Sequence, residues 1–302
     1  MSRSILVPFD GGGHAESALR YATDAFDSPS ITVLYVSNVL EEPGVEATTA
    51  KAQNQADSEY SPAGVPAGPE DERGEAILES AREVGAEQGV EIETEHLVGV
   101  PHRAVVEFAA DRTVDHVVIG GHGRTAVNHP FLGGVSETVV RRSPVSTTIV
   151  PLDPSEYETV DVHGDVLVPV DGSDQSTRAL EYARETFPGA SITVLHVVSL
   201  PFEYSREELG GSTLERLLSR LTGRGEAVVD DTIEDAGIDP ETVDTAITYG
   251  KPPQSIVDYG LDYAFDQVVM GIHGRAKSKR LVTGSVAETV ARRAGFPLTL
   301  VR

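Results

Sequence analysis

Short apolar runs alternate along this chain with longer stretches in which apolar residues recur at helical spacing. Residues 5–7 and 117–119 are examples of the runs, and each lies between polar or glycine-rich segments. Strands that are buried on both faces and alternate with amphipathic helices are typical of a parallel sheet covered on both sides. The pattern therefore predicts an α/β fold of the doubly wound class.

The same reasoning assigns a full series of elements to the first half of the chain. We expect strands at residues 4–8, 30–36, 91–98, 116–119 and 146–150, and helices at residues 15–26, 75–88, 103–111 and 135–142. The series returns between residues 165 and 301. Right-handed crossovers in such a sheet place ligands at the carboxyl ends of the strands. We expect two tandem copies of a doubly wound, Rossmann-like, parallel five-stranded sheet.

Several segments of the first half recur in the second half. Residues 5–11 (ILVPFDG) return as residues 166–172 (VLVPVDG), and residues 31–36 (ITVLYV) return as residues 192–197 (ITVLHV). A period of about 150 residues is the size of one domain, so the chain contains a duplicated domain. We predict domains at residues 1–151 and 165–302, joined by a polar linker at residues 152–164. The proline-containing segment 41–74 is expected to form a long connection.

A glycine-rich loop follows the fourth predicted strand of each copy. The first loop begins Gly120-Gly121-His122-Gly123 and ends at Gly133-Gly134, and the second begins Gly271-Ile272-His273-Gly274 and ends at Gly284-Ser285. Glycine lets backbone N–H groups approach an anion, and the helix that follows adds the partial positive charge of its N-terminus. Both loops therefore have the pattern of a phosphate-binding site.

Composition and charge narrow the class of protein. The chain has 302 residues, no cysteine, and 48 acidic against 24 basic residues, for a net charge of −24. This charge argues against binding to nucleic acid or to anionic membranes, and its even spread suggests a salt-adapted, haloarchaeal source. No apolar run reaches the roughly 20 residues of a membrane span, and residues 1–10 lack the pattern of a secretory signal, so we expect a cytoplasmic protein. Basic residues cluster only in the second glycine loop, at Arg275, Lys277, Lys279 and Arg280.

The second copy carries three separated motifs in order. They are residues 168–173 (VPVDGS), residues 195–198 (LHVV), and a loop with the spacing Gly, two residues, Gly, nine residues, Gly, Ser. Together they resemble the universal stress protein (UspA-like) family, in its tandem form and with its adenine nucleotide α-hydrolase-like fold. The resemblance covers nearly the whole chain. It implies a stress-response module that binds ATP, with or without Mg²⁺. The nucleotide-binding residues that it implies are Pro169, Val170, Asp171, Val197, Met270, Gly271, His273, Gly274, Arg275, Gly284, Ser285 and Val286.

The first copy departs from the motif at a decisive position. Gly134 stands where the second copy has Ser285, so one hydroxyl donor is missing, and its loop keeps Arg124 but lacks the other three basic residues. Loss of a hydrogen bond to a charged group costs about 1.5–3 kcal/mol. We therefore expect ATP at the second copy and weak or no binding at the first. The weaker set of candidate residues is Asp10, Val36, Gly120, His122, Gly123, Gly133 and Gly134.

Three functions remain open at this point. The first is a nucleotide-dependent regulatory protein, the second a slow ATPase or adenylating enzyme, and the third an assembly module that binds no nucleotide. His122 and His273 lie inside the loops, but no nucleophile pattern accompanies them, so we expect no catalytic residue. The histidines offer no closely spaced metal-ligand pair, so we expect no metal site beyond nucleotide-bound Mg²⁺. We favour the first function, with an intrachain pseudo-dimer of the two domains and an unidentified protein partner; the chains could also form a homodimer.

Overall fold

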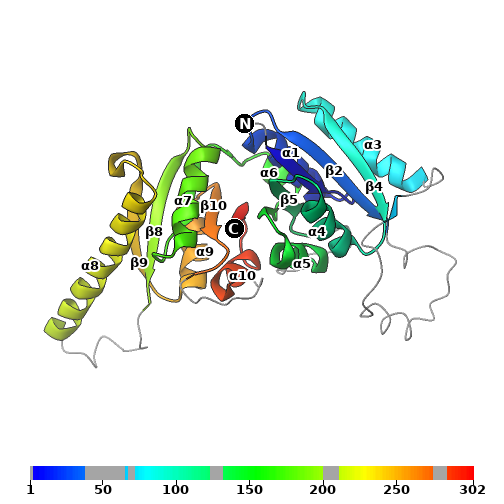
Figure 1. Ribbon diagram of the computed structural model, residues 1–302. Coiled ribbons are helices and arrows are strands. Elements are labelled where there is room, and N and C mark those ends of the chain that lie inside the picture. The colour runs from blue at the N-terminus through cyan, green and yellow to red at the C-terminus, as the bar shows by residue number, and fades with distance from the viewer. Residues whose placement is uncertain (1–2, 38–64, 67–71, 123–131, 200–210, 275–283) are drawn as a thin grey trace, which may run out of the picture. The chain divides into compact units, whose positions relative to one another are not determined.

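The computed structural model describes residues 3–37, 65–66, 72–122, 132–199, 211–274 and 284–302. The chain divides into two compact units. The first unit comprises Met1–Val127 and Gly133–Val145, and the second comprises Asn128–Leu132 and Ser146–Arg302. Each unit alternates strands and helices (Figure 1), as the hydrophobic pattern predicts.

The first unit is a mostly parallel sheet with helices on it. Its elements are β1 (Ser4–Pro8), α1 (Gly13–Ala25), β2 (Ser30–Ser37), β3 (Val65–Pro66), α3 (Glu72–Glu87), β4 (Ile92–Val98), α4 (Pro101–Asp111), β5 (His116–Gly120) and α5 (Gly134–Arg142). The strand order is β3-β4-β2-β1-β5, with β3 antiparallel to β4 and the other pairs parallel. The central strand β1 is buried over Ile5, Leu6 and Val7, which explains its continuous apolar run.

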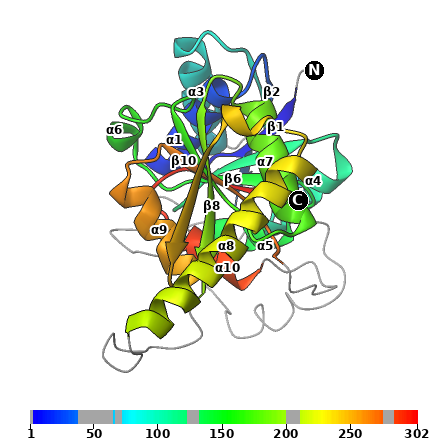
Figure 2. The same cartoon turned by 90° about the vertical axis from the view of Figure 1, so that its left-hand side faces the viewer.

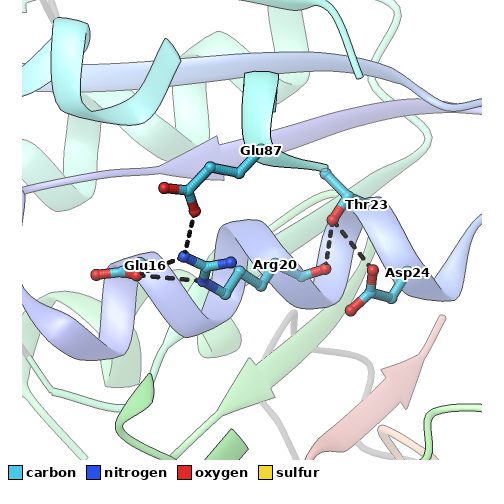
Figure 3. Close-up of polar contacts among 5 residues, drawn as sticks. All are labelled: Glu16, Arg20, Thr23, Asp24 and Glu87. Atoms are coloured by element: carbon cyan, nitrogen blue, oxygen red, sulfur yellow. Dashed lines mark hydrogen bonds and ion pairs between the residues drawn. The ribbon is translucent and has the colours of Figure 1, made fainter. Parts of the chain in front are cut away.

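Helices α1 and α3 pack against each other in this unit, and an arginine joins them. Arg20 on α1 contacts Glu16 one turn earlier, with 3.0 Å between Nη2 and Oε1, and reaches Glu87 on α3 at 2.8 Å (Figure 3). On the last turn of α1, the Thr23 hydroxyl donates to the Arg20 carbonyl at 2.6 Å. Such partly exposed ion pairs contribute little stability each, so the apolar contacts beneath them hold the two helices together.

The second unit repeats this order with a longer helix in its second crossover. Its elements are β6 (Ser146–Val150), α6 (Pro154–Tyr157), β7 (Asp165–Pro169), α7 (Asp174–Thr186), β8 (Ser191–Val198), α8 (Gly211–Asp235), a 3₁₀ turn (Pro240–Thr242), β9 (Asp244–Tyr249), α9 (Pro252–Asp262), β10 (Gln267–Gly271), α10 (Ser285–Ala291) and β11 (Leu298–Val301). The strand order is β6-β11-β10-β7-β8-β9. Helix α8 lies across β8, as Figure 2 shows, and it also contacts α7.

The strand β6 closes the first repeat in sequence but pairs with the last strand of the second repeat. It runs antiparallel to β11, with Ile149 opposite Leu298 and Thr147 opposite Leu300. Between them, the buried hydroxyl oxygens of Thr148 and Thr299 are 2.7 Å apart. Both strands belong to the second unit, so the last strand of the first repeat completes the sheet of the second unit.

Two expected connections contain structure that the sequence pattern did not predict. The polar linker at residues 152–164 includes the single-turn helix α6, whose first backbone N–H groups are capped by Asp153. The segment 41–74 lies mostly outside the described residues, but its described part contains β3 and the start of α3. Among the residues that the structure describes, no helix is both long and apolar enough to cross a membrane.

Candidate functional site

A cavity of about 480 Å³ opens at the carboxyl ends of β7, β8 and β10 in the second unit. Its lining comes from these strand ends, from the glycine loop and from α7, α9 and α10. The lining residues are Pro169, Val170, Asp171, Ser176, Leu195, His196, Val197, Pro252, Ile256, Met270, Gly271, Ile272, His273, Gly274, Gly284, Ser285, Val286 and Ala287. This is the edge of the sheet at which doubly wound folds hold ligands.

The carboxylate of Asp171 is fixed at the end of β7 by a tight turn. Gly172 has φ 74°, a left-handed conformation that favours glycine, and the Ser173 N–H donates to Asp171 Oδ1 at 3.1 Å. Ser173 then begins α7 with a capping box, in which its hydroxyl accepts from the Ser176 N–H. The other carboxylate oxygen faces Gly274, where an added Cβ would lie 2.5 Å from Oδ2. The aspartate is thus aimed at the glycine loop.

The glycines of the loop lie so close to neighbouring atoms that a Cβ at these positions would crowd them. An added Cβ at Gly271 would lie 2.8 Å from the Gln175 carbonyl oxygen on α7, and one at Gly284 would lie 3.1 Å from the Ile272 carbonyl oxygen. The Gly284 N–H donates to the same Ile272 oxygen at 2.8 Å, which brings the two ends of the loop together. Gly284 is also the N-cap residue of α10, and no side chain caps that helix.

Apolar side chains form much of the cavity wall. Leu195, Val197 and Met270 come from the strands and Ile256 comes from α9, and each is at least nine-tenths buried. A flat aromatic ring could pack between such walls, whereas the polar groups gather at Asp171 and along the loop. The cavity therefore has an apolar part and a part rich in hydrogen-bonding groups.

Two histidines line the cavity, and their surroundings differ. His196 Nδ1 donates to the Val170 carbonyl at 2.8 Å, which fixes its ring. His273 lies in the loop, where burial and, to a smaller extent, the positive charge of Arg302 lower its pKa below the ordinary value of 6.5. Both effects favour the neutral imidazole of His273.

The first unit keeps part of this arrangement. The Gly12 N–H donates to Asp10 Oδ1 at 2.9 Å, and an added Cβ at Gly120 would lie 2.6 Å from the His14 carbonyl oxygen. His122 Nε2 is buried without a hydrogen-bond partner among the described residues, and its ring lies 5.3 Å from that of His14. Val36 lies at the carboxyl end of β2.

The end of the first loop differs from its counterpart. Gly133 is the N-cap residue of α5, and its N–H donates to the Gly121 carbonyl at 2.9 Å. At Gly134 an added Cβ would meet no atom of the described residues within 4 Å, so none of those residues excludes a serine there.

The structure brings most of the predicted residues of the second copy to one cavity. These are Pro169, Val170, Asp171, Val197, Met270, Gly271, His273, Gly274, Gly284, Ser285 and Val286. Arg275, the other basic residues of the loop and Gly123 lie outside the described residues. Sequence reasoning missed Pro252 and Ile256, which line the cavity one helical turn apart on α9. The sequence feature that marks Pro252 is the Gly-x-Pro motif, which occurs at residues 99–101 and 250–252.

In the described ranges, no group of three or more histidine, aspartate or glutamate side chains is arranged to hold a metal ion.

Comparison with known proteins gives one consistent family. The sequence matches the Universal stress protein family over residues 1–151 and 164–302. Universal stress protein Slr1230 of Synechocystis sp. is 23% identical over 318 residues, covering 99% of this chain and 100% of that protein. Universal stress protein Rv2005c of Mycobacterium tuberculosis is 26% identical over 238 residues, covering 75% of this chain and 74% of that protein.

A solved structure has the same fold over the full length. The universal stress protein from Archaeoglobus fulgidus superposes with a TM-score of 0.64 at 22% sequence identity, covering 100% of this chain and 97% of that one. The tandem α/β arrangement is therefore shared with a protein of low sequence identity.

Proposed function

The chain belongs to the universal stress protein family, and we propose that its second unit binds an adenine nucleotide, ATP with or without Mg²⁺, as a regulatory ligand. The observation that carries the proposal is the convergence of three groups on one cavity. They are the Asp171 carboxylate, the bare backbone of Gly271 and Gly274, and the start of α10 at Gly284 and Ser285. We assign the nucleotide module to residues 165–302 and its degenerate copy to residues 1–151, with residues 152–164 between them.

Each part of a nucleotide has a chemically suitable place in this cavity. The apolar walls at Leu195, Val197 and Ile256 suit the adenine ring. The Asp171 carboxylate can accept hydrogen bonds from ribose hydroxyls. Backbone N–H groups of the glycine loop, the Ser285 hydroxyl and the N-terminal end of α10 can donate to phosphate oxygens.

The two copies are proposed to differ in affinity. The first copy retains Asp10, Gly120 and Gly133 but has Gly134 in place of Ser285. One lost hydrogen bond to a charged phosphate lowers affinity by tens of fold. We assign ATP to the second unit and weak or no binding to the first.

Regulation then follows from a difference between two states of the protein. A ligand shifts an equilibrium only as far as its affinities for the two states differ. ATP at the second unit would stabilise one state and so alter the surface that a protein partner recognises.

The decisive experiment is an equilibrium titration of the full-length protein. Isothermal calorimetry with Mg²⁺-ATP should give one strong site per chain, and Gly284→Trp should abolish it, because a side chain there meets the Ile272 carbonyl and the His273 backbone. Circular dichroism of the same variant checks that the fold is kept. Absence of binding at millimolar ATP would refute the proposed nucleotide site. Equal binding of ATP at both units would refute only the proposed difference in affinity between them.

Turnover of labelled ATP tests the alternative enzyme. The expected result is no release of phosphate or pyrophosphate above the uncatalysed rate. Steady turnover that is lost in the Gly284→Trp variant would favour a slow ATPase or adenylating enzyme instead.

A further inference from the structure

Titratable groups are few in the wall of the second-unit cavity. Among its lining residues they are Asp171, His196 and His273. Asp171 Oδ1 accepts from the Ser173 N–H, and His196 Nδ1 donates to the Val170 carbonyl. His273 is the titratable group that belongs to the glycine loop itself.

The backbone places His273 between the two glycine-rich ends of the loop. Its neighbour Ile272 donates its N–H to the Val301 carbonyl at 3.0 Å and accepts at its own carbonyl from the Gly284 N–H. An added Cβ at Gly284 would lie 3.4 Å from the His273 Cα. The histidine is therefore beside the first turn of α10.

The charged groups around His273 come from three elements. Arg302 follows β11, and its positive charge is the second cause, after burial, that lowers the pKa of His273. The Asp171 carboxylate on β7 faces the adjacent Gly274. On α10, Glu288 is engaged by Arg292 at 2.8 Å.

Among the described residues, the other neighbours named here are uncharged. On α7, Gln175 lies against Gly271, and α9 contributes Pro252 and Ile256 to the wall.

We propose that His273 takes up a proton from solvent when an anionic nucleotide binds, and that this residue makes the site favour charged nucleotides over uncharged nucleosides. The inference rests on the proposed nucleotide site. A phosphate chain a few ångströms from the ring favours the imidazolium, which can then donate a hydrogen bond to a phosphate oxygen. An uncharged nucleoside provides no such field and leaves the histidine neutral.

Because a proton is taken up on binding, the affinity for the nucleotide depends on pH. One proton taken up on binding raises the affinity by at most about tenfold for each pH unit lowered. Adenosine should bind with the same affinity across that range. The γ-phosphate of ATP itself titrates at about pH 6. The contribution of His273 is therefore the difference in pH dependence of affinity between the wild type and His273→Gln, both titrated with ATP.

The test compares two matched histidine variants of the full-length protein. ATP is titrated calorimetrically at pH 6 to 8.5 in buffers of different ionisation enthalpy, which reports the protons taken up. His273→Gln removes the proposed group, and His122→Gln changes the same motif position in the first repeat. The wild type and His122→Gln should take up more protons than His273→Gln. The affinity of His273→Gln should be about tenfold lower than wild type at pH 6 and close to wild type at pH 8.5.

A second measurement needs no variant of the loop. The pKa of His273, followed by NMR in the wild-type protein, should rise when ATP is added and stay unchanged with adenosine. Equal proton uptake in the wild type and His273→Gln, or an unmoved His273 resonance in an ATP-saturated protein, would overturn the inference while leaving the nucleotide site intact. Absence of ATP binding to the wild type at every pH would instead refute the proposed function.

Discussion

Gly274 lies so close to Asp171 that an added Cβ at position 274 would be 2.5 Å from Asp171 Oδ2. The carboxylate is not free to move away, because its Oδ1 accepts from the Ser173 N–H at the start of α7. The close approach therefore links the end of β7 to the glycine loop. A side chain at position 274 would overlap the Asp171 carboxylate, which is a steric reason for glycine at this position.

This contact predicts the effect of Gly274→Ala. The methyl group must displace either the Asp171 carboxylate or the loop, so a hydrogen bond from the ligand to that charged group is weakened at a cost of about 1.5–3 kcal/mol. We expect ATP affinity to fall by tens of fold in a calorimetric titration. Gly134→Ala in the first repeat is the control, because its methyl group meets no atom of the described residues within 4 Å and should leave ATP binding at the second unit unchanged. Undiminished ATP binding by Gly274→Ala would show that Asp171 does not contact the ligand.

An exchange between the two repeats tests their proposed asymmetry. Ser285→Gly should lower ATP affinity at the second unit by about 10- to 100-fold, because it removes one donor to a charged phosphate. Gly134→Ser should raise affinity at the first unit, where the side chain has open space. The local helix geometry is matched, since Thr289 and Thr138 donate to the Ser285 and Gly134 carbonyls at 2.7 and 2.8 Å. If Ser285→Gly binds as tightly as wild type, the hydroxyl does not reach the phosphate.

Much of the fold could be predicted from hydrophobic periodicity. The strand expected at residues 4–8 coincides with β1, and the one expected at residues 146–150 coincides with β6. Both are short, continuously apolar or β-branched, and bounded by turn residues, which makes the signal local. The antiparallel pairing of β6 with β11 depends on contacts distant in sequence, which a local hydrophobic pattern does not encode.

Helix starts and short elements were harder to predict. Helix α1 begins at Gly13 rather than at residue 15, because glycines at its first positions give no side-chain capping signal. Helix α6 lies in the predicted linker, where Asp153 Oδ1 accepts from the Ser155 and Glu156 N–H groups at 2.9 and 3.1 Å. Asp153 and Glu156 have the spacing of a capping box, but the neighbouring prolines favour a linker.

The candidate site was predicted where a motif supplied it. The loop glycines and Asp171 follow strands directly, so topology alone brings them to one edge of the sheet. Pro252 and Ile256 reach the cavity because α9 packs beside α10 and β8, a tertiary relationship that periodicity does not encode.

A buried histidine makes the stability of the first unit depend on pH. His116 is 1% exposed, lies against the Phe26 ring, and has its pKa lowered to about 3 by burial and by Arg3. The unfolded chain therefore binds more protons below pH 6.5, and the stabilisation present above that pH is lost as pH falls toward 3.

The expected loss can be isolated by substitution. Between pH 7.5 and 5.5 the free energy of unfolding should fall by about 1.4 kcal/mol more in the wild type than in His116→Gln. Glutamine is the natural choice, because Gln267 occupies the equivalent position of the second repeat and is buried. Native-state hydrogen exchange of β5 reports the first unit separately. Identical pH dependence in both proteins would mean that His116 has the same pKa in the folded protein as in the unfolded chain.

Two equivalent helix glycines should respond differently to the same substitution. At Gly74, on α3, an added Cβ would lie 2.0 Å from His96 Cε1, whereas at Gly225, on α8, it would lie 3.1 Å from His196 Cδ2. His96 cannot easily move, because its Nε2 is 2.6 Å from the Ser37 hydroxyl oxygen and its ring packs on Tyr35 at 5.0 Å between centroids.

The balance between helix propensity and overpacking decides the sign of each change. Alanine in place of glycine favours a helix by about 1 kcal/mol, but forcing an atom into a filled site costs about 1–3 kcal/mol or more. We expect Gly74→Ala to destabilise the first unit in urea unfolding, and Gly225→Ala to be close to neutral. The double variant Gly74→Ala, His96→Ala should recover part of the loss, because the methyl group then enters the space vacated by the ring. Equal stability of the two single variants would mean that α3 can shift away from β4 without cost.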